Sequence, residues 1–331
     1  MHLIVEDGSG RLAACAPCYL KSHSQGEYVF DHSWAEAYQR AGGSYYPKLL
    51  VAAPFSPVTG PRLLVRDSDP AARGALIEAL KSLRRQSGVS SLHVTFAEQA
   101  DAEALGSAGF LRRRDQQFHW LNEGYQNFED FLAALASRKR KSIKRERRGA
   151  LASGITIEAL TGKDITEAHW DAFFSFYMDT GSRKWGRPYL TRAFFSAIGK
   201  SMPDKIVLMI ASRAGKPVAG AINFLGLHTL YGRNWGCIED HPFLHFEVCY
   251  YQAIDYAITH KLLRVEAGAQ GEHKLARGYR PVTTHSAHDI GDPGFRRAIA
   301  DFLKREGGYV KASAEELSQH LPFRQIEKSG L

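Results

Sequence analysis

The sequence predicts an α/β (α+β) fold in which mixed central sheets are flanked by helices. Residues 2–121 show two strand patterns followed by helix, strand, helix and strand. Residues 206–276 show three strands, a helix, a strand and a helical turn. The crossover at residues 264–281, RVEAGAQGEHKLARGYRP, concentrates glycines and polar groups after a short strand, at the strand end where open α/β sheets commonly bind ligands.

Length and composition indicate an ordinary globular protein. The chain has 331 residues, 44% hydrophobic and 24% charged, which excludes a disordered polypeptide and allows two domains. Its 43 Lys and Arg exceed 35 Asp and Glu, giving a net charge of +8 and a pI near 9.2. This surplus permits an anionic partner such as nucleic acid or a CoA-like phosphate, although it is also typical of plain solubility.

The sequence predicts no membrane-spanning segment and a cytoplasmic location. No apolar run approaches the roughly 20 residues of a spanning helix, and residues 1–6 lack the features of a signal peptide. The pair Cys15 and Cys18 has the spacing of a metal knuckle, but no second pair supplies the four ligands that zinc requires. We therefore expect no metal site.

A first domain is predicted over residues 1–121. Strands at 2–6 and 11–20 form a hairpin around the turn 7–10, with Pro17 marking an edge or a bulge. Helices are predicted at 34–40, 70–86 and 101–108, and strands at 91–96 and 110–121. Because this domain begins inside a hairpin, we expect it to lack its opening helices.

Residues 122–150 are predicted to form a basic interdomain helix. The segment from Arg138 to Arg148 carries eight cations and one anion, a density that attracts phosphate and fits nucleic acid. A solvated helix whose long side chains lie along the surface is an equally good interpretation.

A second domain is predicted over residues 151–331. Helices are expected at 167–182, 194–201 and 246–261, and strands at 206–213, 217–227 and 228–237. Alternation along the last strand places Tyr231, Arg233 and Trp235 on one face. Asn223 lies between apolar neighbours on the preceding strand, and Glu247 lies in the first turn of a helix, where capping is its ordinary role.

The chain resembles the FemAB-like branch of the GNAT acyltransferase superfamily, a bacterial group of predicted N-acyltransferases related to peptidoglycan biosynthesis. The most specific match is EAGAQGEHK at residues 266–274 with RGY at 277–279. Shorter matches lie at residues 28–31, 45–49, 57–62, 138–149 and 180–183. The resemblance implies two GNAT-like domains in tandem. One departure is the loop 236–245, which holds two acids and a proline where CoA-dependent members have a glycine-rich pyrophosphate loop.

The resemblance implies direct transfer of an acyl or aminoacyl group to an amine, a reaction that needs a base and oxyanion donors. Glu266 is the predicted base, with His273 as the alternative, and Asn223 and Tyr231 complete the catalytic candidates. Arg183, Arg233, Lys274 and Arg277 are predicted to bind the donor, its phosphates or a carboxylate. The other candidates for contact with substrate or donor are Trp185, Tyr189, Trp235, Glu247, Gln270, Gly271 and Tyr279.

No tightly bound cofactor is expected. The co-substrate is either acyl-CoA or aminoacyl-tRNA, the latter bound through Arg138 to Arg148, and the acceptor is a small-molecule or peptide amine. Two other hypotheses remain. A capped connection with solvated charges is the alternative interpretation of the crossover at 264–281, and a non-catalytic protein that binds RNA or a cell-wall fragment is the alternative for the whole chain.

Overall fold

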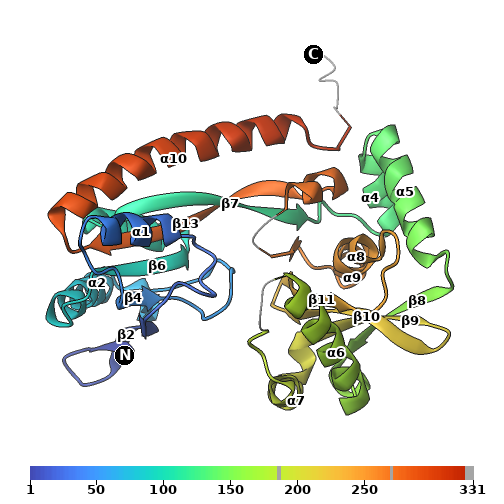
Figure 1. Cartoon of the computed structure of the whole chain (residues 1–331), viewed down its shortest axis with the longest axis horizontal. Coiled ribbons are helices and arrows are strands. Elements are labelled where there is room, and N and C mark those ends of the chain that lie inside the picture. The colour runs from blue at the N-terminus through green and yellow to red at the C-terminus, as the bar shows by residue number, and fades with distance from the viewer. Residues whose placement is uncertain (185–187, 269–270, 325–331) are drawn as a thin grey trace. The chain divides into compact units, whose positions relative to one another are not determined.

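The computed structural model describes residues 1–184, 188–268 and 271–324, without the side chains of 182–184 and 272. It divides into two compact units. Unit 1 comprises Met1–Gln117 and Val282–Glu316, and unit 2 comprises Phe118–Pro281 and the stretch that begins at Leu317. Each unit contains strands and helices, so the predicted mixed α/β class is confirmed (Figure 1).

The division differs from the predicted boundaries at residues 121 and 150. The chain returns to unit 1 after Pro281, where a strand and a long helix complete that unit. The basic segment lies within unit 2, because Phe131 and Ile143 of residues 122–150 are buried in its core. Local sequence patterns do not reveal such long-range pairing, which explains the difference.

Unit 1 contains two sheets and most of the helices of the first half of the chain. Its strands are β1 (Leu3–Glu6), β2 (Leu12–Ala16), β3 (Cys18–Lys21), β4 (Lys48–Val51), β5 (Leu64–Val65), β6 (Ser91–Ala97), the first part of β7 (Leu111–Leu121) and most of β13 (Arg280–Ile290). Its helices are α1 (His32–Arg40), η1 (Arg66–Ser68), α2 (Pro70–Gln86), α3 (Gln99–Ser107) and most of α10 (Pro293–Gln319).

Local signals account for several of these elements. Helix α2 begins at Pro70, a residue suited to the first helical position, and the Asp69 carboxylate caps it by accepting from the Ala71 N–H. The predicted returning strand of the opening hairpin is interrupted at Pro17, which has no N–H to donate. As a result β2 pairs in a small sheet of order β1-β2-β5, while β3 joins the order β3-β4-β6-β13.

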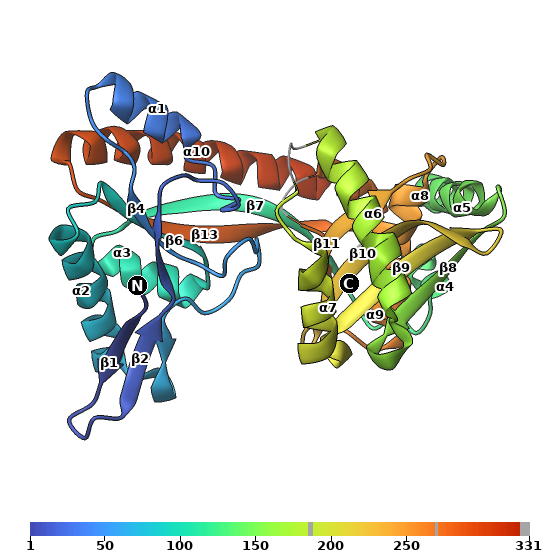
Figure 2. The ribbon, with the colours of Figure 1, turned by 60° about the horizontal axis from the view of Figure 1, so that its bottom comes forward.

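Helices cover both faces of the larger unit 1 sheet. Helices α2 and α3 pack with Leu49, Leu92 and Ala287 in one apolar cluster, and α1 and α10 cover the other face through Trp34 and Phe295. Figure 2 shows α1 and α10 on one side of β4, β6 and β13, with α2 and α3 on the other. Strands β4 and β6 run parallel, whereas β3 and β13 run antiparallel to their neighbours, so the sheet is mixed.

Unit 2 has the sheet order β7-β12-β11-β10-β9-β8, in which only β11 and β12 run parallel. The strands are the end of β7 with β8 (Ile155–Thr161), β9 (Ile206–Arg213), β10 (Lys216–Leu225), β11 (Thr229–Cys237) and β12 (Arg264–Glu266). The helices are α4 (Phe128–Ala134), α5 (Ser137–Leu151), η2 (Gly162–Asp164), α6 (Glu167–Lys184), α7 (Arg192–Ser201), η3 (Pro203–Lys205), α8 (Leu244–Phe246), η4 (Glu247–Tyr251), α9 (Gln252–Thr259) and η5 (Glu272–Arg277).

Two apolar clusters lie on opposite faces of this sheet. Helices α6 and α7 pack on one face with Ile206, Ile222 and Phe224, and helices α4, α5 and α9 pack on the other with Ala221 and Val265 (Figure 1). The predicted helix at 246–261 consists of a short α-helix, a π-helical turn and α9. In the described part of the chain, no helix combines the length and apolar character needed to cross a membrane.

Candidate active site

The short strand β12 places Glu266 in a row of side chains across three strands. Glu266 pairs with His119 of β7 on one side and with Tyr231 of β11 on the other. Residues directly opposite each other in a sheet project from the same face, so the three side chains are neighbours. The row continues through Phe224 of β10, which places it on the face that α6 and α7 cover.

The environment of Glu266 raises the fraction of its neutral form near pH 7. The residue is only 5% exposed, and burial raises its pKa to about 7 although Arg264 opposes this effect. Oε1 lies 3.3 Å from Arg264 Nε, and Oε2 lies 3.8 Å from His119 Nε2, beyond hydrogen-bond distance. Among the described residues, Oε2 has no hydrogen-bond partner. A buried carboxyl that titrates near neutral pH is typical of a general acid or base.

His119, the neighbour of Glu266 in the row, and Lys274, whose charge acts on His119, also have shifted pKa values. Burial lowers the pKa of His119 to about 4, helped by the positive charges of Arg264 and Lys274, so the imidazole is neutral at pH 7. Lys274 is 1% exposed, and burial lowers the pKa of its ammonium to about 8. The Lys274 ammonium donates to the Gly268 carbonyl at 3.3 Å, which ties η5 back to the end of β12.

Glycines shape the connection between β12 and η5. Gly268 and Gly271 adopt φ of 77° and 120°, which other residues rarely adopt. A Cβ on Gly271 would lie 2.5 Å from the His273 ring, so the close approach of that ring also requires glycine. Strand β12 ends at Glu266, two residues before the predicted end near Gly268, and the predicted glycine stop at Gly278 is confirmed.

A β-bulge overturns the predicted common face of Tyr231, Arg233 and Trp235. Asn223 of β10 pairs with Gly232 and Ile222 pairs with Asn234, so Arg233 is the extra residue of the bulge in β11. The bulge shifts the alternation by one residue. Tyr231 therefore shares the face of Glu266, whereas Trp235 points to the opposite face and contacts His245.

Asn223 also lies on the face opposite Glu266. Ala221, two residues earlier on β10, points to the same face as Asn223 and belongs to the apolar cluster around α9. The Asn223 side-chain amide donates to the Val207 carbonyl at 3.2 Å and to the Ala221 carbonyl at 3.4 Å. The residue is 1% exposed, so these bonds satisfy a buried polar group within the sheet.

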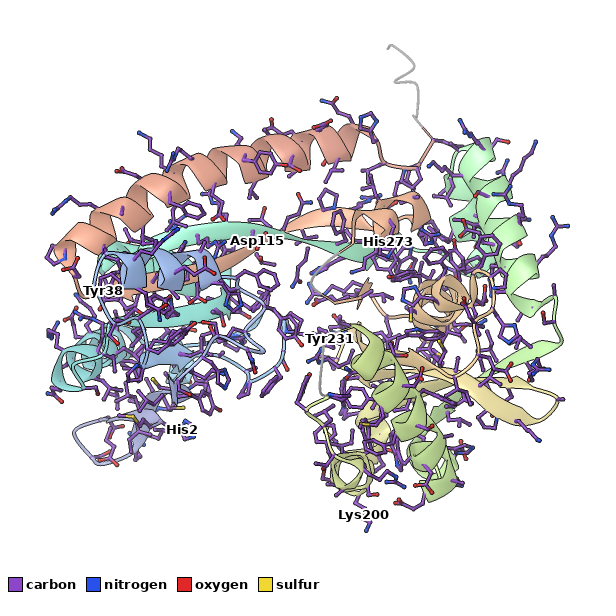
Figure 3. The ribbon with its side chains drawn as sticks, in the orientation of Figure 1. His2, Tyr38, Asp115, Lys200, Tyr231 and His273 are labelled. Carbon is purple, nitrogen blue, oxygen red and sulfur yellow. The ribbon has the colours of Figure 1, made fainter. Side chains whose placement is uncertain are left out.

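His273, the alternative base, belongs to an aromatic cluster with π-helix η4. Its Nε2 lies 2.8 Å from the Tyr250 hydroxyl, and its ring packs against Phe246. No hydrogen bond joins His273 to Glu266 in the described residues. Figure 3 labels His273 on η5 and Tyr231 on β11. π-Helical turns occur frequently at functional sites.

Arg277, predicted to bind phosphate or carboxylate, is occupied by groups of the chain itself. It is 6% exposed, and its guanidinium stacks 3.5 Å from the centre of the Phe246 ring. It donates to the His273 carbonyl at 2.7 Å and to the Glu146 carboxylate at 3.0 Å. Glu146 is the single acid of the basic segment, and it accepts from the Tyr251 hydroxyl as well. These bonds attach helix α5 to η5.

Glu247 and Tyr279 are both fully buried. The Glu247 carboxylate accepts from the Arg147 Nε at 3.1 Å and from the Gln252 amide at 2.8 Å, and burial raises its pKa. Glu247 therefore forms an internal ion pair that joins η4 to α5. Tyr279 packs against Tyr250, and its hydroxyl has no hydrogen-bond partner in the described part of the chain.

Tyr189 and Arg233, predicted separately from a basic loop and from β11, come together. The Arg233 guanidinium donates to the Tyr189 hydroxyl at 2.6 Å. Trp185 and Gln270 lie outside the described residues, and the Arg183 side chain does so too. No group of three or more His, Cys, Asp or Glu side chains that could hold a metal occurs within residues 1–184, 188–268 and 271–324.

A concavity of about 1070 Å³ runs along α4 and α5. Phe128 and Leu132 form its apolar part, and Glu129 and Ser142 also line it. The remaining lining residues are all cationic, namely Arg138, Lys139, Lys141, Lys144, Arg145, Arg147 and Arg148. Lys144 pairs with Glu129 at 2.7 Å, and Arg147 pairs with Glu247. The lining carries a strong positive surplus.

The family comparison covers almost the whole chain. Residues 1–325 match FemAB_like, a family described by peptidoglycan biosynthesis/recognition. The chain belongs to this FemAB-like family. No protein of curated function matches its sequence.

Solved structures of similar fold accompany the family match. L-PGS from Bacillus licheniformis superposes with a TM-score of 0.56 at 9% identity, covering 91% of this chain and 89% of that one. FemX superposes with a TM-score of 0.55 at 12% identity, covering 91% and 90%. Identities this low indicate a shared fold alone. The resemblance inferred from the sequence motifs is therefore confirmed at the level of family and fold.

Sequence reasoning missed His119 at the candidate site. It lies between Phe118 and Trp120, which are both buried, on a strand predicted without any functional residue. A lone histidine between two aromatic residues of a strand was the available signal. Its neighbour Glu266 is about 150 positions away along the chain, so only strand pairing brings them together.

Proposed function

We propose that this FemAB-like protein transfers an acyl or aminoacyl group from an activated donor to an amine acceptor, with Glu266 as the general base. The observation that carries the proposal is the state of Glu266: buried, with a pKa of about 7 and with one carboxylate oxygen that has no hydrogen-bond partner among the described residues. Such an oxygen is suited to accept a proton from an amine at neutral pH.

In the proposed reaction the acceptor amine attacks the donor carbonyl, and its proton passes to Glu266 Oε2. The tetrahedral intermediate carries a negative oxygen. We assign its stabilisation to the Lys274 ammonium of η5, which is bonded to the Gly268 carbonyl, and to the hydroxyl of Tyr231, which pairs with Glu266 across β11 and β12. Collapse of the intermediate breaks the bond to the leaving group, which takes the proton back from Glu266. His119 is neutral at pH 7 and supplies no proton in this scheme.

We further propose aminoacyl-tRNA as the donor, with acyl-CoA as the alternative. Seven cationic side chains line the basic concavity of α4 and α5, of which Lys144 and Arg147 pair with acids of the chain itself, and the remaining positive surplus would attract a phosphate backbone. In the loop before α8, by contrast, Glu239 pairs with Arg213 and His241 and adds negative charge where a CoA pyrophosphate would need N–H donors. The family description supports a peptidoglycan-related amine as the acceptor.

Two measurements test these proposals. Native mass spectrometry of freshly purified protein identifies any RNA or CoA ester that co-purifies. Transfer of radiolabelled amino acid from a charged tRNA pool to peptidoglycan-precursor peptides is then compared for the natural chain, for Glu266→Gln and for Glu158→Gln, an exposed acid of the same unit. The scheme is supported if RNase treatment abolishes transfer by the natural chain, and if Glu266→Gln abolishes transfer while Glu158→Gln retains it.

Other outcomes distinguish the alternatives. Transfer that survives RNase and saturates with acyl-CoA would identify the thioester donor. Full activity in Glu266→Gln would remove this residue from the role of base. Salt-dependent RNA binding without transfer from any donor would favour a binding protein.

A further inference from the structure

One face of the unit 1 sheet carries several polar side chains although helices cover it. Most apolar side chains of β4, β6 and β13 belong to the cluster with α2 and α3. The positions of opposite alternation include Lys48, His93 and His288, each at most 1% exposed. Helices α1 and α10 lie over this other face of the sheet (Figure 2). Alternation of this kind normally marks a face open to water. Here it is buried, and buried polar groups destabilise a fold unless they are paired.

Lys48 is the centre of a hydrogen-bonded network. Its ammonium donates to Ser24 Oγ at 2.7 Å, to Glu27 Oε2 at 2.7 Å and to Asp31 Oδ2 at 2.5 Å. These three bonds use all three of its N–H groups. The Tyr45 hydroxyl donates to the same Asp31 oxygen at 2.6 Å.

The network extends to the two histidines. The Tyr45 hydroxyl lies 3.3 Å from His93 Nε2, and His93 Nδ1 lies 2.7 Å from His288 Nδ1. Burial, with the nearby charges of Lys48 and Arg113, lowers the pKa of His93 to about 3. Burial likewise holds the pKa of His288 well below its usual value, so both rings are neutral at pH 7.

Three buried polar atoms of this region have no hydrogen-bond partner among the residues that the structure describes. They are Glu27 Oε1, Asp31 Oδ1 and the indole Nε1 of Trp34. Their residues are 5%, 2% and 2% exposed. All three come from the same short stretch, the loop after β3 and the first turn of α1. The network therefore presents two open acceptors and one open donor in the interior of unit 1.

The charges around these atoms indicate what would fit them. Two carboxylates face one ammonium, and Arg113, which approaches the Trp34 ring, is already paired in two bonds with Glu306 of α10. The surplus is negative when both carboxyls are ionised, although burial raises the pKa of Glu27 against the opposing charge of Lys48. The open oxygens need donors. We propose that unit 1 binds a small primary amine in its ammonium form, which donates to Glu27 Oε1 and Asp31 Oδ1. An oxygen on the same ligand would accept from Trp34.

This site is independent of the transfer proposed for unit 2, and ligand binding tests it directly. The full chain is labelled with ¹⁵N at tryptophan, and the indole signal of Trp34 is assigned from its loss in Trp34→Phe. Ethanolamine is then titrated in parallel with choline, which has the same hydroxyl and charge but no N–H donor. We expect a saturable shift of the Trp34 signal with ethanolamine and none with choline.

Two variants examine the contacts. Glu27→Gln removes the negative acceptor and should weaken ethanolamine binding by about tenfold or more. Glu36→Gln changes an exposed acid of α1 and should leave binding unchanged. Unaltered signals of Trp120 and Trp170 verify that unit 2 is folded in each sample. If Glu27→Gln perturbs unit 1, the comparison of ethanolamine with choline on the natural chain still decides. Equal shifts with both compounds, or no saturable shift with ethanolamine, would overturn the proposal.

Discussion

Replacing Glu266 by Gln should stabilise unit 2 at alkaline pH while abolishing transfer. Burial raises the pKa of Glu266 from 4.5 to about 7. Between these values the folded chain binds more protons than the unfolded chain, so this residue makes stability fall as pH rises through that window. Gln is neutral at every pH and mimics the protonated acid in shape.

The size of the effect follows from the pKa difference. One pKa unit corresponds to about 1.4 kcal/mol. The raised pKa of Glu266 therefore lowers the unfolding free energy of the natural chain, relative to a chain with a neutral side chain here, by about 3 kcal/mol at pH 8 and about 1 kcal/mol at pH 5. Glu266→Gln should therefore gain up to about 3 kcal/mol over the natural chain at pH 8. It should gain much less at pH 5, where the folded natural chain keeps the proton. A stabilising substitution that removes activity is typical of a functional residue held in an unfavourable state.

Denaturant unfolding at the two pH values measures this difference. Tryptophan fluorescence reports mainly on unit 2, which holds four of the five tryptophans of the chain. Glu158→Gln, at an exposed position on β8, is the control and should show no pH-dependent gain. An equal difference in unfolding free energy between Glu266→Gln and the natural chain at both pH values would refute a raised pKa at this carboxyl.

Three other substitutions or conditions should have measurable effects. Arg147→Ala leaves the buried Glu247 carboxylate without its cation and should destabilise unit 2 by about 3 to 5 kcal/mol in denaturant unfolding. Gly236→Ala places a Cβ against the Phe176 carbonyl of α6 and should lower the unfolding free energy by about 1 to 3 kcal/mol. Because His93 is buried with a pKa near 3, unit 1 should lose stability as pH falls from 6.5 toward 3, which hydrogen exchange of its amides would show.

Matched controls accompany these measurements. Lys144→Ala removes an exposed cation of the same helix as Arg147 and should change stability by no more than about 0.5 kcal/mol. Gly307→Ala introduces a Cβ into open space on α10 and should stabilise the helix by about 0.5 to 1 kcal/mol. Wild-type-like stability in Arg147→Ala or Gly236→Ala would contradict the packing described here. A pH-independent exchange rate of unit 1, after correction for intrinsic exchange, would contradict the buried neutral histidine.

Much of the fold was predictable because its signals are local. The helix predicted at 70–86 is α2 to the residue, since a proline start, a regular leucine spacing and a glycine stop lie within one continuous segment. The β12 strand and the glycine turn after it were likewise readable, because positive φ restricts those positions to glycine. The FemAB-like motifs added the family, which the match over residues 1–325 confirms.

The candidate site was predictable only in part. Glu266 and Tyr231 were both candidates from the sequence, and the pairing of β11 with β12 makes them neighbours. Trp235 was assigned to the wrong face because one extra residue in β11 shifts the alternation, and a bulge depends on pairing with β10 rather than on β11 alone. Arg277 was predicted to meet a ligand, but its partner Glu146 comes from a helix more than a hundred residues earlier.

By itself the sequence determined much of the secondary structure, the glycine-shaped crossover, the basic segment and the family, since each depends on residues close together along the chain. Only the tertiary structure decided which charges are buried, which strands pair and which chain segments complete unit 1. Burial sets the pKa of Glu266, strand register gives it His119 as a neighbour, and the return of β13 to unit 1 brings His288 beside His93. These properties arise from contacts between distant segments, which local periodicity does not encode.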